Sequence, residues 1–277
     1  MKKSIVLWII AFVLTLITAA YQRMTGPTYP VKNEINIGGK IIKYSLDRSH
    51  GGDENHLIKI KTDNESISGI VQWKRFKTND EWTVDTMMFQ SGYLTALLPH
   101  QPPAGKLIYK ITFIKDGNIF NLNDGHPVVI RFKGDVPVFI LIPHIILIFL
   151  AMLFSTRTGL EFFKKEPVYN KLVYWTFGLL ILGGMIFGPI MQKYAFGAFW
   201  TGVPFGIDLT DNKTLIAVIG WVIALIAMKK SPDPKKRIIF ASILMFIVYL
   251  IPHSVLGSEL DYNQVDKQKN KIEKSSD

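Results

Sequence analysis

The sequence GPIMQKYAFGAFWTGVPFGIDLTDNKT, residues 188–214, lies between two strongly apolar runs and decides how the chain is organised. It contains four glycines and two prolines, and it ends in the polar group Asp208, Asp211, Asn212 and Lys213. Aromatic side chains are enriched at membrane–water interfaces, and glycine allows the backbone to bend there. Its aromatic residues are Tyr194, Phe196, Phe199, Trp200 and Phe205. The stretch therefore predicts a structured loop at a membrane surface rather than a spacer.

Apolar runs on both sides of this loop indicate a membrane protein. The chain is 48% hydrophobic, with a mean hydropathy of +0.21. A membrane-spanning helix needs about 20 apolar residues. We therefore predict an α-helical membrane protein with five transmembrane helices, of which the fourth is the shortest. The five runs are Ile5–Ala20, Val136–Phe154, Leu172–Met191, Leu215–Met228 and Ile238–Leu256.

The formal net charge of +10 follows the predicted membrane topology, so it does not indicate binding to nucleic acid. Basic residues cluster before the first run, between the second and third, and between the fourth and fifth. Cytoplasmic segments carry an excess of Lys and Arg. We therefore expect a bacterial-type cytoplasmic (inner) membrane location, with the N-terminus inside and residues 21–135, the aromatic loop and the C-terminus outside. The basic residues are Lys2, Lys3, Arg157, Lys164, Lys165, Lys171, Lys229, Lys230, Lys235, Lys236 and Arg237.

These patterns divide the chain into four segments. Residues 1–25 are predicted to form an N-terminal transmembrane anchor, although the MKK start and Ala19-Ala20 also fit a cleaved signal peptide. Residues 26–135 form a β-sandwich outside the membrane, in the periplasm. Residues 136–261 form a four-helix transmembrane domain that carries the loop 188–214. Residues 262–277 are polar, and we expect a disordered tail there.

The segment between the first two runs alternates apolar and polar residues in short stretches separated by turn residues, which is typical of β-strands. The predicted strand over 34–46 breaks at Gly38-Gly39, and Asp116-Gly117 predicts a tight hairpin. About seven strands in roughly a hundred residues indicate a two-sheet sandwich. Because the chain has no cysteine, its core alone must hold this domain together.

The segment LPHQPPAGKLIY, residues 98–109, resembles the edge-to-core crossing of immunoglobulin-like and fibronectin type III domains, in which a tyrosine opens a central strand. This resemblance covers only the β-domain and implies an immunoglobulin-like sandwich. Such domains more often bind or space other molecules than catalyse reactions, and the fold does not fix a function.

Two histidines follow prolines inside the apolar runs, in Pro143-His144 and Pro252-His253. An ionisable side chain within a membrane is costly unless it faces a cavity or a partner, so such a residue is a candidate functional group. The alternative is a structural hydrogen bond between helices. If both are functional, they could be axial ligands of a haem, ligands of a divalent metal, or a pair that handles protons or contacts a quinone. Gln192 and Trp200 are expected to line the same outward-facing pocket.

Carboxylates flank the fourth and fifth runs. Asp211 is predicted to cap the helix that begins at residue 212 or 213. His253, Asp208, Glu259 and Asp261 form a candidate metal-ligand set, although their spacing matches no established motif.

The sequence carries no phosphate-cradling glycine loop, no Gly-x-Ser-x-Gly elbow and no His-Glu-x-x-His helix. The leading hypothesis is therefore a non-catalytic membrane accessory or assembly component. Its pocket at His144, His253 and the loop 188–214 would bind a cofactor, a lipid or a partner, and its β-domain would dock an envelope or membrane protein. The alternatives are a haem- or metal-binding redox protein and a small transporter.

Overall fold

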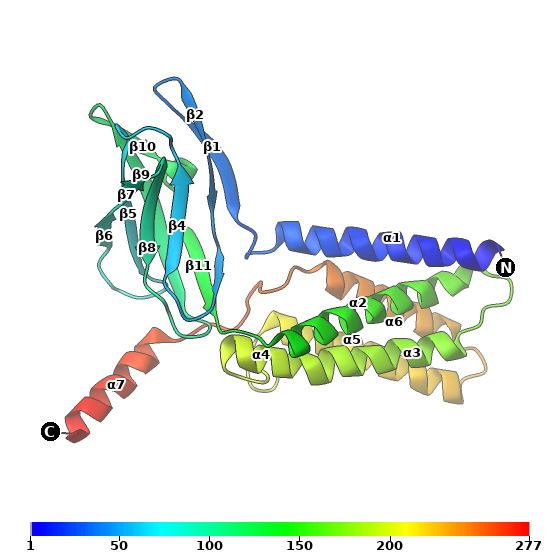
Figure 1. Cartoon of the computed structure of the whole chain (residues 1–277). Helices are drawn as coiled ribbons and strands as arrows, with labels where there is room; N and C mark the ends of the chain where they lie inside the picture. Colours follow the sequence, from blue (N-terminus) through cyan, green and yellow to red (C-terminus); the bar gives the residue numbers. More distant parts are fainter. Residues whose placement is uncertain (1, 277) are drawn as a thin grey trace. The chain divides into compact units, whose positions relative to one another are not determined.

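The chain is described by a computed structural model over residues 2–276, and it folds as two compact units (Figure 1). The first, called the helical unit below, comprises Met1–Pro27 and Val136–Ser258. The second, called the β unit, comprises Thr28–Asp135 and Glu259–Asp277. The β unit therefore takes in the C-terminal segment as well as the strands.

The helical unit is built from helices that follow the apolar runs of the sequence. The third run forms one continuous helical rod whose middle has π-helical geometry around Gly183 and Gly184. The elements are α1 Lys2–Thr25, α2 Val138–Leu160, a 3₁₀ turn Glu161–Phe163, α3 Asn170–Leu180, the π-helical segment Ile181–Phe187, α4 Gly188–Phe196, α5 Leu209–Lys230 and α6 Lys235–Leu250.

Four helices in the described part of the chain are long and apolar enough to cross a membrane. The helix α6 has 16 residues and ends at Leu250, before the second Pro-His pair. At 1.5 Å per residue it is about 24 Å long, shorter than the roughly 30 Å of a bilayer core. The four spans are Lys3–Thr25, Val138–Phe163, Asn170–Phe196 and Leu209–Lys230.

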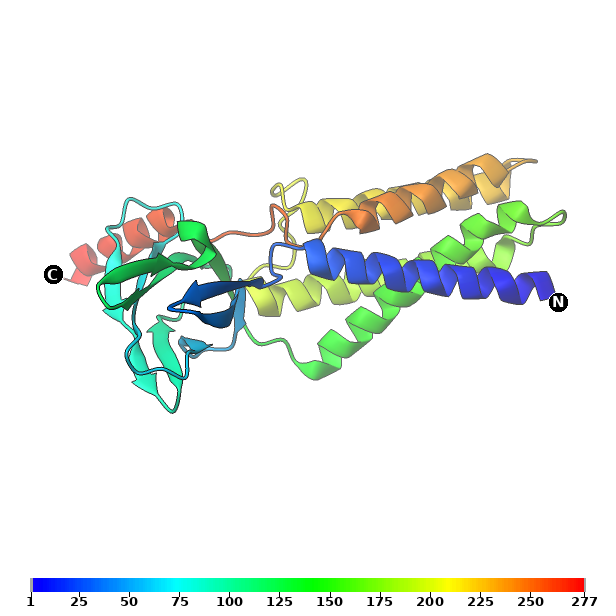
Figure 2. The same ribbon diagram turned by 90° about the horizontal axis from the view of Figure 1, so that it is seen from above.

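The helix α2 is the centre of the helical unit, because α1, α3 and α6 all pack against it (Figure 2). The other close pair is α5 with α6, where the buried indole of Trp221 donates a hydrogen bond of 3.1 Å to the sulfur of Met245. A Cβ atom on Gly183 would approach the Ile148 backbone nitrogen to 3.0 Å. Glycine at 183 therefore allows the third rod to pack closely against α2.

Most strands of the β unit lie where the alternating pattern predicts them, but the short strand over Ser49–Gly51 was not predicted. The chain reverses at Gly38-Gly39, whose φ angles are +59° and +81°, and at Asp116-Gly117, whose φ angles are +50° and +77°. Both predicted breaks are confirmed. The strands are β1 Val31–Ile37, β2 Lys40–Leu46, β3 Ser49–Gly51, β4 His56–Lys61, β5 Ser68–Arg75, β6 Thr83–Thr86, β7 Met88–Gln90, β8 Tyr93–Leu98, β9 Lys106–Lys115, β10 Asn118–Asn121 and β11 Val128–Lys133.

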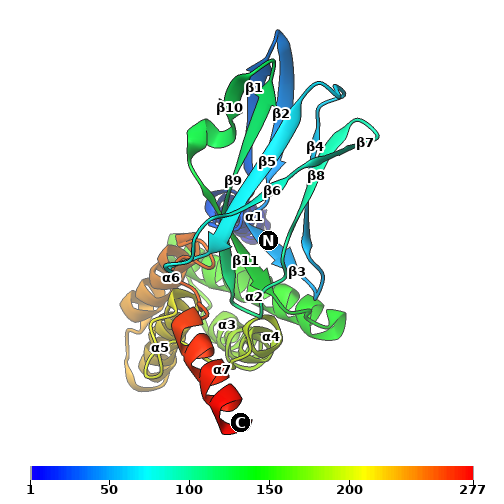
Figure 3. The same cartoon turned by 90° about the vertical axis from the view of Figure 1, so that its left-hand side faces the viewer.

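Within residues 2–276, three sheets rather than the predicted two enclose the core of the β unit (Figure 3). The largest has the order β3-β11-β9-β5-β6, with β10 also paired to β9. The second has the order β4-β8-β7, and β1 and β2 form a separate pair. Tyr109 and Phe113 of β9 are fully buried at the centre of the largest sheet, and the Tyr109 hydroxyl donates to the Asp47 carbonyl at 2.8 Å.

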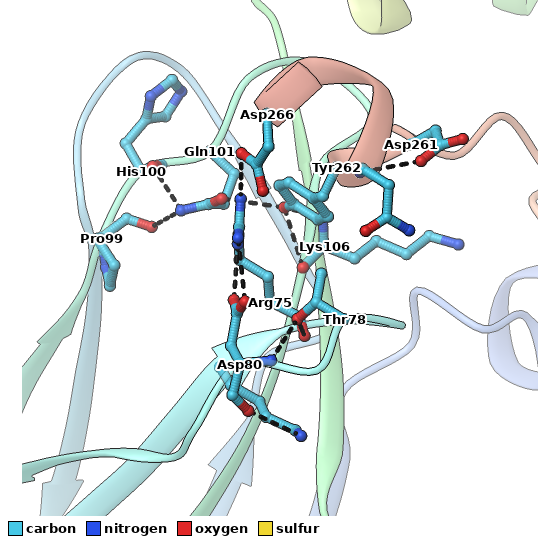
Figure 4. Close-up of polar contacts among 12 residues, drawn as sticks. Arg75, Thr78, Asp80, Pro99, His100, Gln101, Lys106, Asp261, Tyr262 and Asp266 are labelled. Atoms are coloured by element: carbon cyan, nitrogen blue, oxygen red, sulfur yellow. Dashed lines mark hydrogen bonds and ion pairs between the residues drawn. The ribbon is translucent and has the colours of Figure 1, made fainter. Parts of the chain in front are cut away.

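The C-terminal tail differs from the sequence prediction. Residues 262–277 were expected to be disordered, but the structure has helix α7 over Tyr262–Ser276. The buried Tyr262 anchors it. The Tyr262 hydroxyl accepts from the Lys106 backbone nitrogen at 2.9 Å and lies 3.0 Å from the Gln101 amide oxygen (Figure 4). Burial raises the pKa of Tyr262 to about 12, so its phenol stays protonated at neutral pH.

An arginine completes this anchor. Arg75 binds both carboxylate oxygens of Asp80, at 2.6 and 3.0 Å, and reaches Asp266 of α7 at 2.9 Å (Figure 4). Its guanidinium lies 5.0 Å from the centre of the Tyr262 ring. Most of α7 is polar and exposed to solvent. Its first turns are held on the sheet by residues that are far from it in the sequence.

Candidate functional site

The loop 188–214 begins as helix α4, which ends at Phe196 and is followed by Gly197 with a left-handed φ of +86°. The Gly197 nitrogen donates to the Lys193 carbonyl, and the Lys193 ammonium in turn donates to the Gly197 carbonyl at 2.7 Å. Glycine takes this conformation without strain and is the usual residue just past a helix C-terminus. The chain then turns irregularly until Asp208, where α5 begins.

Asp208, rather than Asp211, is the residue that caps α5. Its Oδ1 accepts the backbone N–H of Thr210 at 2.8 Å, so the prediction that Asp211 is the N-cap is wrong. The Oδ2 of Asp208 accepts the backbone N–H and the hydroxyl of Ser258 at 2.7 and 2.8 Å, and the hydroxyl of Thr201 at 3.2 Å. Burial alone would raise the pKa of Asp208, but these hydrogen bonds from Ser258, Thr210 and Thr201 hold it below its ordinary value.

Asp211 instead holds the loop from the first turn of α5. Its Oδ2 accepts the backbone N–H groups of Thr201 and Gly202 at 2.6 and 3.0 Å, and the Gln192 amide at 3.1 Å. A Cβ atom on Gly202 would approach the Asp211 Cβ to 2.7 Å, which explains the glycine. We call Gln192, Thr201, Asp208, Asp211 and Ser258 the loop network.

A buried lysine extends this arrangement to the neighbouring helices. Lys213 is only 4% exposed and donates to the Ile251 carbonyl at 2.7 Å, just past the end of α6. The same carbonyl accepts the Gln22 amide of α1 at 3.2 Å. Lys213 therefore joins α5 to the chain that leaves α6. The sequence gave no signal for this burial.

The two Pro-His pairs lie in different surroundings. The Nδ1 atom of His144, in α2, lies 2.9 Å from the Gly183 carbonyl of the neighbouring rod. His253 lies beyond the end of α6 and is solvent-exposed. Gln192 belongs to the loop network, whereas Trp200 donates its indole N–H to the nearby Val203 carbonyl at 3.0 Å.

The candidate metal set is divided between the two units. His253 and Asp208 belong to the helical unit, and Glu259 and Asp261 belong to the β unit. Glu259 pairs with Lys106 at 2.9 Å, and the Asp261 carboxylate accepts backbone N–H groups at the start of α7. Within residues 2–276, no group of three or more His, Asp or Glu side chains is arranged to hold a metal ion.

Sequence reasoning missed a buried charge cluster at the end of α2. Arg157 was assigned to a cytoplasmic connection, but it lies within α2 and is 2% exposed. It pairs with Glu161, which is 1% exposed, at 2.6 Å, and Lys164 reaches the same carboxylate at 2.8 Å. The other Glu161 oxygen accepts the Val168 backbone N–H at 3.1 Å. The i, i+4 spacing of Arg157 and Glu161 is the only sequence signal for this pair.

The outer surface of the loop is apolar. Phe205 and Ile207 are 81% and 79% exposed, and Phe199 and Val203 are also exposed. Their backbone is fixed in several places. The Val203 nitrogen donates to the Asn212 side chain at 2.7 Å, and the Asp208 nitrogen donates to the Thr201 carbonyl at 3.0 Å. The loop thus directs its polar groups inward and its large apolar side chains outward.

Comparison with known proteins gave no match to a family model, to a curated protein or to a solved structure.

Proposed function

We propose that the protein is a non-catalytic integral membrane component that docks a membrane protein partner through the loop 188–214. The observation that carries this proposal is the combination of a loop network satisfied inside the chain with apolar side chains held outward by the same loop. An apolar patch on a fixed backbone is typical of a binding surface, because its side chains lose little additional freedom when they are covered.

The location and topology of the protein are part of this proposal. A bacterial-type cytoplasmic membrane with the N-terminus inside accounts for the three basic segments, and α6 then serves as a short fifth span. The β unit and the C-terminus lie outside, and the β unit is an immunoglobulin-like sandwich that docks an envelope protein. The chain has no cysteine of its own, so labelling of single introduced cysteines from either side of the membrane tests this orientation.

The docking function predicts position-specific crosslinking. A photoreactive phenylalanine analogue at Phe205 is expected to give a discrete protein adduct in native membranes, larger than the 31.5 kDa chain. The matched control is the same analogue at Phe163, in the 3₁₀ turn that follows α2. Phe163 is 72% exposed and is expected to contact lipid only. Lipid adducts alone from both positions would contradict the proposal.

A second candidate function, cofactor binding by His144 and His253, is favoured by one contact. Histidine ligands of metals commonly donate the other ring N–H to a backbone carbonyl, and His144 makes such a contact with Gly183. This pair would hold a haem or a divalent metal through the remaining ring nitrogens.

Cofactor binding predicts a visible absorption band or about one metal ion per chain in detergent-purified protein. Either signal would be lost in both His144→Ala and His253→Ala, because each variant removes one ligand. His126→Ala, in the β unit, is the control and should leave the signal unchanged. Wild-type protein with neither signal, purified from cells supplied with haem and metals, would remove this candidate.

A further inference from the structure

The β unit has a shallow, open groove of about 820 Å³ where two of its sheets meet, which we call the cleft. One side comes from the β1–β2 pair and the other from β4 and β8, and β2 lies next to β4. The lining residues are Lys32, Asn33, Glu34, Lys43, Tyr44, Ser45, Lys59, Ile60, Lys61 and Tyr93. No residue of the helical unit contributes to this lining.

Both sides end in strands with a free edge. Within residues 2–276, β2 forms a ladder with β1 alone, and β4 forms a ladder with β8 alone. At one end of the cleft, the Lys40 ammonium donates a hydrogen bond to the Thr62 carbonyl at 2.8 Å and so links β2 to the end of β4. Edge strands present backbone N–H and C=O groups to an extended chain, which can add a strand there.

The charge of the lining selects one class of ligand. Four lysines and one glutamate line the cleft. The Lys59 ammonium lies 4.2 Å from the centre of the Tyr93 ring, and Lys61 lies 3.4 Å from an Asp63 carboxylate oxygen. Lys43 is directly opposite Glu34 across the β1–β2 ladder. Excess positive charge around a concave surface attracts an acidic ligand and makes its binding sensitive to salt.

The free strand edges favour a polypeptide over a membrane surface. Tyr44 and Ile60 border the cleft but are only 7% and 2% exposed, so their side chains belong to the core and the basic residues alternate with them on the outer face. An extended chain can pair its backbone with an edge strand, whereas a planar bilayer would contact the lysines alone.

We propose that this cleft binds an extended acidic segment of a partner polypeptide, which pairs its backbone with the free edge of β2 or β4 and places carboxylates near Lys43 and Lys59. This surface lies on the β unit, and the proposal does not depend on docking through the loop 188–214.

The test uses the full-length protein in neutral detergent and a labelled ten-residue peptide that alternates glutamate and valine. Fluorescence anisotropy should show saturable binding that weakens at least about tenfold when glutamine replaces the glutamates or when salt is raised to about 0.5 M. N-methylation of alternate backbone amides should also abolish binding, because it removes the donors of an added strand.

Two variants test whether the peptide binds at this site or responds only to the net positive charge of the protein. The double variant Lys43→Glu/Lys59→Glu changes two exposed side chains and should reduce affinity at least about tenfold. The control Lys271→Glu, on the exposed part of α7, should stay within about twofold, and circular dichroism should show unchanged folding of both.

Four results would overturn the proposal, of which three involve binding of some kind. The first is equal affinity for the glutamate and glutamine peptides. The second is an affinity that the double variant does not change. The third is a protein that binds no peptide but binds vesicles of anionic lipid through Lys43 and Lys59. This third result would assign the lysines to a lipid surface. The fourth, the absence of any binding, would mean that the lysines only protect the strand edges from aggregation.

Discussion

Glu161→Gln is expected to destabilise the helical unit by about 3–5 kcal/mol, the usual cost of removing one partner from a buried ion pair. Glutamine has nearly the same shape, so the loss comes from charge rather than from a cavity. The guanidinium of Arg157 would stay buried without its partner at 2.6 Å, and Lys164 would lose its contact at 2.8 Å. Thermal unfolding in detergent should show the midpoint fall by roughly 10 °C.

Two further variants test the cause of this effect. Glu166→Gln removes an exposed carboxylate from the same connection and should change stability by no more than about 0.5 kcal/mol. The double variant Arg157→Met/Glu161→Leu replaces the pair with apolar side chains and should recover most of the loss, because apolar packing often substitutes for a buried ion pair. A midpoint for Glu161→Gln that matches the Glu166→Gln control would show that the pair is not important for stability.

Asp211→Ala is expected to cost about 2–4 kcal/mol and to loosen the loop 188–214. The change removes the acceptor of the backbone N–H groups of Thr201 and Gly202 and of the Gln192 amide, all of which are bound in the native loop. Hydrogen exchange followed by mass spectrometry should show faster exchange in peptides that contain residues 197–207. Exchange in the β unit should not change.

The matched control for this variant is Asp233→Ala, because Asp233 is exposed and its carboxylate accepts one backbone N–H, from Lys235, at 3.3 Å. It should leave exchange in the loop unaltered. If Asp211→Ala also leaves exchange in the loop unaltered, this carboxylate does not hold the loop. The fixed backbone on which the docking proposal rests would then have no explanation.

The β unit shows how much could be predicted from local pattern. The longer strands were predictable because most of them alternate between core and surface, as β9 does over Lys106–Lys115. Turns were predictable because Gly38-Gly39 and Asp116-Gly117 adopt the positive φ angles that these residue types tolerate. The same reasoning could not find the cleft, because the approach of the β1–β2 hairpin to β4 and the pairing of β4 with β8 depend on long-range packing.

The candidate site was predictable in position but not in its contacts. Glycines and aromatic residues identified the loop 188–214, but the helix cap was assigned to Asp211 although Asp208 supplies it. Both residues satisfy local rules for a helix cap. The choice between them depends on Ser258 and Thr201, which approach from other parts of the chain. Helix α7 was missed for a similar reason, since Tyr262 is anchored by residues more than 150 positions away.

The sequence by itself determined the helices of the apolar runs and most strands of the β unit, where the loop 188–214 lies and which connections are basic, because hydrophobic periodicity and backbone propensity act over a few neighbouring residues. Only the tertiary structure decided which charged groups are buried. Arg157, Glu161, Asp211 and Lys213 resemble ordinary surface residues in the sequence, yet each is almost fully buried in the fold. Burial of a charge is favourable only when partners from other segments satisfy it, and those partners are brought together by packing of the whole unit.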